Sequence, residues 1–271
     1  MNLKDSFHPY AAVTIIFWSL AYVLTRLTLQ YFSAFSLGFL RYFIASCVLA
    51  IVAILTKMKA PRRADLPWLI TAGGVGFFLY MIAFNQGQAT VTASTGSVVI
   101  ATVPVITALL ARLFYGERLG AAQWVAILVE FVGVVVLTLM NGMFSINTGL
   151  FWLFLAALAL SAYNLLQRKL TKTYTALQAS TYGIFFGTLM LAVFAPASVR
   201  EIPHAPAVQF VYLAILGVCS SAIAYVSWAK AFSKAKKTSQ VSNYMFITPF
   251  LTSVFGFLMA GEVPDRATLL G

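Results

Sequence analysis

Aromatic, amide and hydroxyl residues recur at helical spacing along several apolar segments of this chain. The candidates are Trp18, Tyr22, Tyr80, Phe84, Asn85, Gln88, Ser97, Tyr163, Asn164, Gln167, Tyr225, Trp228 and Ser242. Aromatic rings enclose the apolar part of a ligand, while hydroxyl and amide groups orient its polar ends. These residue types in this pattern favour the binding of an amphipathic small molecule.

The same residue types also have structural uses in an apolar helix, and that alternative stays open here. Trp and Tyr anchor helices at a membrane interface, and small hydroxyl residues such as Ser97 and Ser242 permit close contact between helices. An amide is more informative, because an amide in hydrocarbon needs a partner or a water-filled cavity. Asn85, Asn164 and Gln167 are therefore the strongest binding candidates.

Residues for catalysis or metal binding are not grouped in the sequence. His8 and His204 lie outside the apolar segments, and Cys47 and Cys219 lie singly inside two of them. No glycine-rich phosphate loop of the Gly-Lys type occurs. We therefore predict that the protein is not an enzyme, with no catalytic residue, no metal, no cofactor and no hydrolysis of ATP.

The elements that carry the candidates are long apolar segments. Of the 271 residues, 61% are hydrophobic and 9% are charged, whereas soluble domains carry about 25% charged residues. The apolar segments fall at 10–29, 34–56, 67–90, 93–115, 121–141, 149–168, 176–197, 207–233, 239–261 and from about 266 onward. A run of roughly 20 apolar residues spans the hydrocarbon layer as a helix. The sequence thus predicts one all-α membrane domain of ten transmembrane helices, with the lipid bilayer and a small-molecule substrate as its partners.

The net charge of +11 is explained by the orientation of the chain in a membrane. If the N-terminus is cytoplasmic, most Lys and Arg residues fall at cytoplasmic helix ends, as the positive-inside rule requires. Nucleic-acid binding would instead need a basic face on a soluble module, and no such module is present in the sequence. We predict an integral protein of the bacterial cytoplasmic (inner) membrane with a cytoplasmic N-terminus.

An internal repeat determines the predicted architecture. One shift of 145 positions places Tyr80 on Tyr225, Ser97 on Ser242, Pro104 on Pro249, Thr107 on Thr252, Gly116 on Gly261 and Glu117 on Glu262. This predicts two five-helix units, residues 1–141 and 149–271, the second with an incomplete tenth helix. Because five is odd, the units enter the membrane from opposite sides, and such inverted repeats enclose a solute site near the bilayer midplane.

Pro104 and Pro249 occupy matching positions in the two units. Proline removes a backbone donor and leaves a helix carbonyl free, which permits bending. We predict a gating role for both residues, with simple structural kinking as the alternative.

The segment from Pro104 through Gly116-Glu117-Arg118-Leu119, with Gln123-Trp124 and Gly133, and its echo from Pro249 to Gly261-Glu262, resemble the repeated EamA-type domain of the drug/metabolite transporter superfamily. Phe17-Trp18-Ser19 and Arg41-Tyr42-Phe43-Ile44-Ala45 resemble the first two helices of that family. Within the family, the resemblance favours the amino-acid exporter branch that handles aromatic substrates. The echo departs from the pattern where Val263-Pro264 replaces the Arg-Leu pair. The resemblance implies a central cavity among the first, third and fourth helices and their counterparts, with the fifth and tenth helices outside it.

The predicted function is export of small organic solutes, foremost amino acids including aromatic ones, by alternating access. A drug, sugar-phosphate or nucleotide-sugar carrier of the same fold is one alternative, although phosphate substrates favour several cations and the spans offer Arg41 and Lys230. A membrane-embedded enzyme or a channel is the alternative from another class. Glu130, within the fifth segment, is either a proton carrier or a structural partner of a cation such as Arg41.

Overall fold

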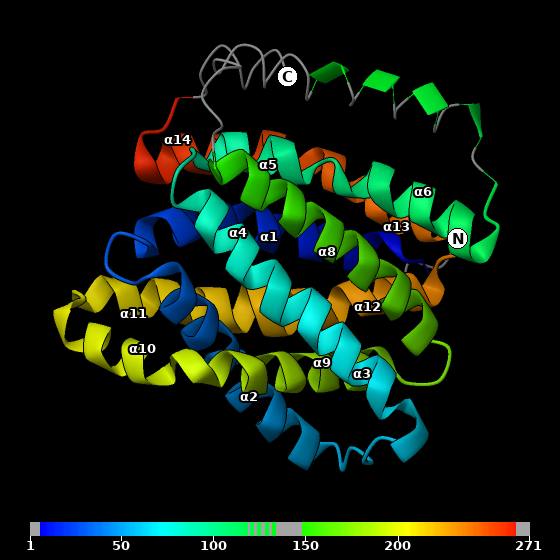
Figure 1. Ribbon diagram of the computed structural model, residues 1–271, viewed down its shortest axis with the longest axis horizontal. Helices are drawn as coiled ribbons and strands as arrows, with labels where there is room; N and C mark the ends of the chain where they lie inside the picture. The colour runs from blue at the N-terminus through cyan, green and yellow to red at the C-terminus, as the bar shows by residue number, and fades with distance from the viewer. Residues whose placement is uncertain are drawn as a thin grey trace.

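The computed structural model describes residues 6–118, 120–121, 124–125, 128–129, 132–133 and 148–263, and these residues are helical with no strand among them (Figure 1). The first half contains α1 (His8–Thr28), α2 (Ala34–Leu55), α3 (Leu66–Gly73), α4 (Tyr80–Gln88), α5 (Ala93–Ile100) and α6 (Val103–Tyr115). The second half contains α8 (Thr148–Leu170), α9 (Ala176–Leu191), α10 (Ala195–Glu201), α11 (Ala207–Ala214), α12 (Ala224–Lys234), α13 (Thr238–Ser242) and α14 (Thr248–Ala260). Short 3-10 turns occupy Arg63–Asp65, Ala192–Phe194, Ile202–His204 and Asn243–Ile247.

Several of these helices join end to end into longer apolar segments. In the described part of the chain, eight such segments are long and apolar enough to cross a membrane: His8–Thr28, Ala34–Leu55, Arg63–Gln88, Ala93–Tyr115, Thr148–Leu170, Ala176–His204, Ala207–Lys234 and Thr238–Ala260. They coincide with eight of the ten predicted spans. The predicted fifth span lies largely, and the tenth wholly, outside the described residues, so the count of ten and the unit limits at 141 and 149 stay predictions.

Local sequence explains where the helices begin and end. The side chains of Ser33, Thr92 and Thr175 each accept a hydrogen bond from a backbone N–H of the first turn of α2, α5 and α9. These bonds satisfy donors that a helix leaves free at its start. At the other end, α6 and α14 stop at Gly116 and Gly261, whose φ angles of 65° and 63° place them in the left-handed region. Glycine enters that region without the penalty of a Cβ atom.

Two pairs of irregular segments occupy corresponding places in the two halves. A π-helical segment, Gly74–Leu79, precedes Tyr80, and another, Ile215–Ile223, closely precedes Tyr225. The helix also breaks before each of the paired prolines, since Pro104 lies in the first turn of α6 and Pro249 in the first turn of α14. Both spans are therefore interrupted just before the proline, and the gating role and the kinking alternative both stay predictions.

Helices of one half pack on helices of the other in a reciprocal pattern. Helix α1 packs on α12 and α14, while its counterpart α8 packs on α4 and α6. Helix α5 packs on α14, and α6 packs on α13, so the corresponding segments α5–α6 and α13–α14 run antiparallel. Figure 1 shows α5, α6 and α14 along the upper side of the bundle and α2 and α9 along the lower side.

The molecule is apolar on its outside as well as in its interior. Trp228, Tyr42 and Tyr163 are fully buried, whereas Ile54 and Leu113 are each 75% exposed. A soluble protein rarely exposes an apolar surface of this extent. The outer side chains are suited to contact lipid tails, as expected for an integral membrane protein.

Candidate binding site

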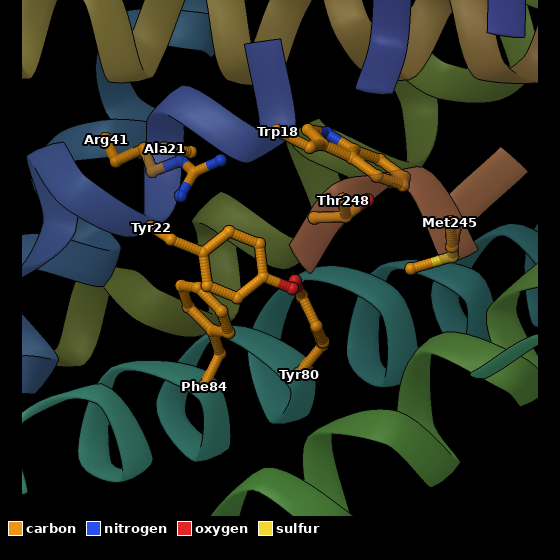
Figure 2. Close-up of a pocket in the computed structure, with 8 residues that line it drawn as sticks. All are labelled: Trp18, Ala21, Tyr22, Arg41, Tyr80, Phe84, Met245 and Thr248. Atoms are coloured by element: carbon orange, nitrogen blue, oxygen red, sulfur yellow. The ribbon is translucent and has the colours of Figure 1, made fainter. Parts of the chain in front are cut away.

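A small cavity lies between α1, α2, α4 and the start of α14, where the two halves of the chain meet. It is lined by Trp18, Ala21, Tyr22, Arg41, Tyr80, Phe84, Met245 and Thr248 (Figure 2). Its volume is about 10 Å³, which is room for no more than one water molecule. Four of the predicted site residues therefore share one cavity that is closed to a solute.

One wall of this cavity is formed by three rings. The Tyr22 ring lies 5.1 Å from the Phe84 ring at an angle of 76°, and the Tyr80 ring stacks on Phe84 at 5.6 Å. Edge-to-face and offset-stacked rings attract each other through their quadrupoles. An entering aromatic group can replace either contact with a similar one.

The opposite wall is formed by Trp18, which screens a second group of rings from the cavity. Tyr225 and Trp228 each lie 5.1 Å from Trp18, measured between ring centroids. Tyr163 lies further along, 5.8 Å from Tyr225. Tyr163, Tyr225 and Trp228 thus belong to the same aromatic core as the cavity, although they do not line it in this conformation.

The π-helical segment Ile215–Ile223 supplies polar groups to the edge of the cavity. Trp18 donates its indole N–H to the carbonyl of Ser220 at 3.2 Å. Arg41 donates from Nε to Ser221 Oγ at 2.7 Å and from Nη2 to the Ser220 carbonyl at 3.4 Å. A π-helical turn disturbs the regular backbone bonding of a helix and occurs often at functional sites. Here its carbonyl holds two cavity side chains in place.

The buried amides divide into two kinds. Asn164 accepts the indole N–H of Trp228 at 3.0 Å and donates to Thr107 Oγ1 at 3.2 Å. Gln167 donates to the Tyr163 hydroxyl at 2.5 Å. Asn164 therefore joins Trp228 of the second half to Thr107 of the first. Gln167 bonds within the second half, and its Oε1 has no partner in the described residues.

Asn85 and Gln88 are less well satisfied. Asn85 donates to the carbonyl of Ala34 at 2.8 Å, but its Oδ1 has no partner in the described residues. Neither Oε1 nor Nε2 of Gln88 has one, and both side chains are fully buried. A buried polar group without a partner is destabilising by about 1–3 kcal/mol. These amides therefore have bonding capacity that the closed conformation does not use.

The paired serines bond within their own helices. Ser97 donates to the carbonyl of Ser94 at 2.7 Å, and Ser242 donates to that of Ser239 at 3.3 Å. Both are fully buried between helices. This geometry agrees with the packing alternative, and a binding role for them stays a prediction.

The two ends of the bundle are joined by matching carboxylates. Glu117 follows α6 and accepts hydrogen bonds from the backbone N–H and the hydroxyl of Thr238, at the start of α13. Glu262 follows α14 and accepts a bond from the backbone N–H of Ala93, at the start of α5. Each half therefore caps the fourth span of the other half, where a negative charge is favoured at a helix N-terminus. The alignment of Glu117 with Glu262 in the repeat did not predict this contact between the halves.

An arginine lies near each of these capping glutamates, and the two ends of the bundle are called the Arg26 end and the Arg168 end after them. At the Arg26 end, Arg26 Nε lies 3.1 Å from Glu262 Oε1, and its Nη1 donates to the carbonyls of Gln88 and Val91. At the Arg168 end, Arg168 donates to the carbonyls of Phe232, Ala235 and Lys236. Each arginine thus ties the first helix of its half to the segment before the fourth span of the same half, and Arg26 also joins the two halves through Glu262.

Residues 7–139 and residues 147–271 each match the sequence profile of the EamA-like transporter family. The chain belongs to this family. The two matches cover the two repeats, and the family is described as one of transporters.

Individual relatives of this EamA-like chain have different functions. The chain is 31% identical over 96% of its length and 87% of the other's to a probable terminal-alkyne amino-acid exporter of Streptantibioticus cattleyicolor. It is 25% identical to an S-adenosylmethionine uptake transporter of Rickettsia bellii, over 88% of this chain and 79% of the relative. One solved crystal structure matches with a TM-score of 0.67 at 17% identity, covering 96% of this chain and 92% of the other. At this low identity, the structural match shows only that the two chains share a fold.

A larger hollow of the EamA-like fold lies away from the predicted residues. It has a volume of about 470 Å³ and runs along α3, α6 and α8, with Trp68, Phe114 and Lys169 among its lining residues. Phe114 is 67% exposed, so this hollow opens on the side of the bundle. It contains none of the predicted site residues.

Sequence reasoning missed four residues of the cavity lining, which are Ala21, Arg41, Met245 and Thr248. It also missed Tyr42, which lies outside the lining and donates its hydroxyl to that of Tyr225 at 3.2 Å. The signal for Arg41 was available, because a cation inside a span is by default a functional candidate. Lys230, the other cation named from the sequence as available to a phosphate, is exposed, and Glu130 lies outside the described residues. No group of three His, Cys, Asp or Glu residues that could hold a metal occurs among the described residues.

Proposed function

We propose that this protein exports small organic solutes, foremost amino acids including aromatic ones, across the bacterial cytoplasmic membrane by alternating access and without ATP hydrolysis. The observation that carries this proposal is the aromatic cavity between the two halves, formed by Trp18, Tyr22, Tyr80 and Phe84. Rings with polar edges suit a solute that combines an apolar side chain with polar ends. The likeness to an amino-acid exporter over nearly the whole chain supports the same class of solute.

Alternating access is supported by the closed state of the cavity. A volume of about 10 Å³ admits no amino acid, so the helices must separate before a solute can bind. The antiparallel arrangement of α5–α6 and α13–α14 supports inverted repeats, which exchange conformations to expose one central site to each side in turn. The distribution of Lys and Arg supports a cytoplasmic N-terminus, with the Arg168 end toward the cytoplasm.

The alternatives within the transporter class differ in the charge that they need. Nucleotide sugars and sugar phosphates favour several cationic side chains, and in the described part of the chain the cavity lining includes one, Arg41. One relative is named for the uptake of S-adenosylmethionine. The transport test must therefore include that solute and must measure inward as well as outward flux. A channel would pass solutes without saturation.

The test is transport by the purified protein in liposomes. Saturable exchange of phenylalanine, tryptophan and leucine is expected, with empty liposomes as the background and S-adenosylmethionine, a nucleotide sugar and a cationic drug as competing solutes. Preloaded vesicles then give the direction of net flux. Flux restricted to nucleotide sugars or to S-adenosylmethionine would reject the amino-acid proposal.

Variants test the position of the site within the same assay. Trp18→Ala, Tyr163→Ala and Trp228→Ala each remove a ring from the aromatic core and should raise KM. Trp68→Ala is the matched control, because Trp68 lies in the lateral hollow and is 44% exposed. Unchanged transport in all three core variants would contradict the assignment of this cavity.

A further inference from the structure

Arg41 is a buried cation within an apolar span. It lies in α2, one of the segments that can cross a membrane, and is 3% exposed. A charged side chain at this depth is costly and is retained where it has a partner or a function. The partners of Arg41 therefore decide what it does.

The partners that the structure gives to Arg41 are neutral. They are the hydroxyl of Ser221 and the carbonyl of Ser220. The four acidic residues of the described chain are engaged at helix ends: Asp65 with Tyr174, Glu117 with Thr238, Glu201 with Ser33, and Glu262 with Arg26 and Ala93. In the part of the chain that the structure describes, the Arg41 charge is therefore not balanced by an anion.

The guanidinium also retains donors that face the cavity. Arginine has five N–H groups, and the bonds to Ser220 and Ser221 use Nε and Nη2. Nη1 donates to no described residue. Figure 2 shows the guanidinium above Tyr22, with its nitrogens turned toward the space between Tyr22 and Trp18.

We propose that Arg41 binds the carboxylate of the transported solute, so that the site selects apolar and aromatic carboxylates. This deepens the proposed function and rests on it. When the cavity opens, a carboxylate receives paired N–H bonds from the guanidinium, which matches its planar geometry. The apolar side chain of the solute then packs against Tyr22, Phe84 and Trp18. The solute supplies the anion that the closed cavity lacks.

The proposal predicts selection by the acid group. The wild-type protein should bind phenylalanine and 3-phenylpropionate, which share a carboxylate, about 10- to 100-fold more tightly than phenylalaninamide and phenethylamine, which lack it. Binding is measured by calorimetry or thermal stabilisation on the purified full chain. This comparison uses four ligands on one protein, so it does not depend on whether a variant folds.

Variants identify the residue that carries this selection. Arg41→Gln should remove the preference for carboxylates while leaving the weak binding of phenylalaninamide within about twofold of wild type. Arg41→Lys keeps the charge but loses the paired geometry, and should keep a reduced preference. Arg200→Gln is the matched control, because Arg200 is exposed on α10, away from the cavity.

The outcomes separate this proposal from the proposed function. If wild type does not discriminate carboxylates from amides, or if folded Arg41→Gln keeps the preference, the role of Arg41 is refuted even if amino acids are transported. If aryl carboxylates bind through Arg41 but amino acids are not transported, the proposed function fails and the anion site stands. If the double variant Arg41→Gln/Glu130→Gln restores the carboxylate preference that Arg41→Gln loses, Arg41 serves to neutralise Glu130 and the proposal is overturned.

Discussion

Glu262→Gln is expected to open the Arg26 end of the molecule more often. Glu262 holds that end by two bonds, one to Arg26 Nε at 3.1 Å and one to the backbone N–H of Ala93 at 3.0 Å. Both bonds join α14 to the first half of the chain, so both must break when the two halves separate there. The glutamine keeps an acceptor for Ala93 and loses the charge that attracts Arg26.

The size of the effect follows from the exposure of the pair. The Arg26 and Glu262 side chains are 31% and 17% exposed, so the pair is screened less than a surface salt bridge and more than a buried one. Loss of the charge should weaken the closed end by about 1 kcal/mol, and Glu262→Ala, which also removes the Ala93 bond, by about 2 kcal/mol. As long as the open form is less populated than the closed form, Glu262→Gln should raise the open population about 5-fold and Glu262→Ala about 25-fold.

Cysteine labelling measures this population. Cys47 and Cys219 are first replaced by alanine, and Ala21, which lines the cavity and is 3% exposed, is changed to cysteine. The rate of modification by a membrane-impermeant thiol reagent, added on the side of the Arg26 end, then reports the open fraction. Glu262→Gln should raise that rate about 5-fold, as derived from the lost ion pair.

Glu117→Gln is the matched control, because Glu117 makes the corresponding contact at the Arg168 end. It should lower labelling from the Arg26 side and raise it from the other side. An unchanged rate in Glu262→Ala, or the same increase from the same side in Glu117→Gln, would refute the view that these carboxylates hold the two ends closed.

Three further substitutions have defined outcomes. Gly76→Ala should lower the thermal midpoint of unfolding, because a Cβ atom at Gly76 would lie 2.2 Å from Cδ2 of Tyr163. Such overpacking is destabilising by about 1–3 kcal/mol, and a midpoint equal to that of the wild type would contradict this contact. Trp228→Phe keeps a ring but removes the indole N–H that Asn164 accepts at 3.0 Å. Transport should therefore show a several-fold higher KM. An unchanged KM would place Trp228 and Asn164 outside the binding site. Glu130→Gln should leave proton-dependent flux largely intact if the acid is structural, whereas loss of that flux would make Glu130 a proton carrier.

The membrane spans were predictable because they depend on composition along the chain alone. A run of about 20 apolar residues must form a helix in hydrocarbon, and eight predicted spans agree with the structure to within a few residues, apart from longer ends at 63 and 204. The repeat was visible for a related reason. Glycine at 116 and 261 suits a left-handed helix end, and proline at 104 and 249 suits the first turn of a helix.

The detailed site was less predictable because it depends on contacts between helices. The π-helical segments shift the direction of Tyr80 and Tyr225 relative to an α-helix, and no residue in them marks that geometry. The sequence likewise did not show that Tyr163, Tyr225 and Trp228 lie behind Trp18 rather than beside it. Arg41 was visible as a cation in a span. Its hydrogen-bond partners, Ser220 and Ser221, were not predictable because they lie about 180 residues away along the chain.

The fourth span of each half has a break at its centre and a hydrogen-bonded contact to the other half at its end. From this combination we predict that the two ends open separately. Glu262 ties the start of α5 to the end of α14, and Glu117 ties the start of α13 to the end of α6. A continuous helix would transmit a movement at one end to the other as a rigid rod. The breaks before Pro104 and Pro249 interrupt both spans, since proline lacks the N–H that would continue the helix. We therefore expect the half-helices α5 and α14 to separate at the Arg26 end while α6 and α13 stay joined at the Arg168 end. This is the movement that exposure of a closed central cavity to one side would require.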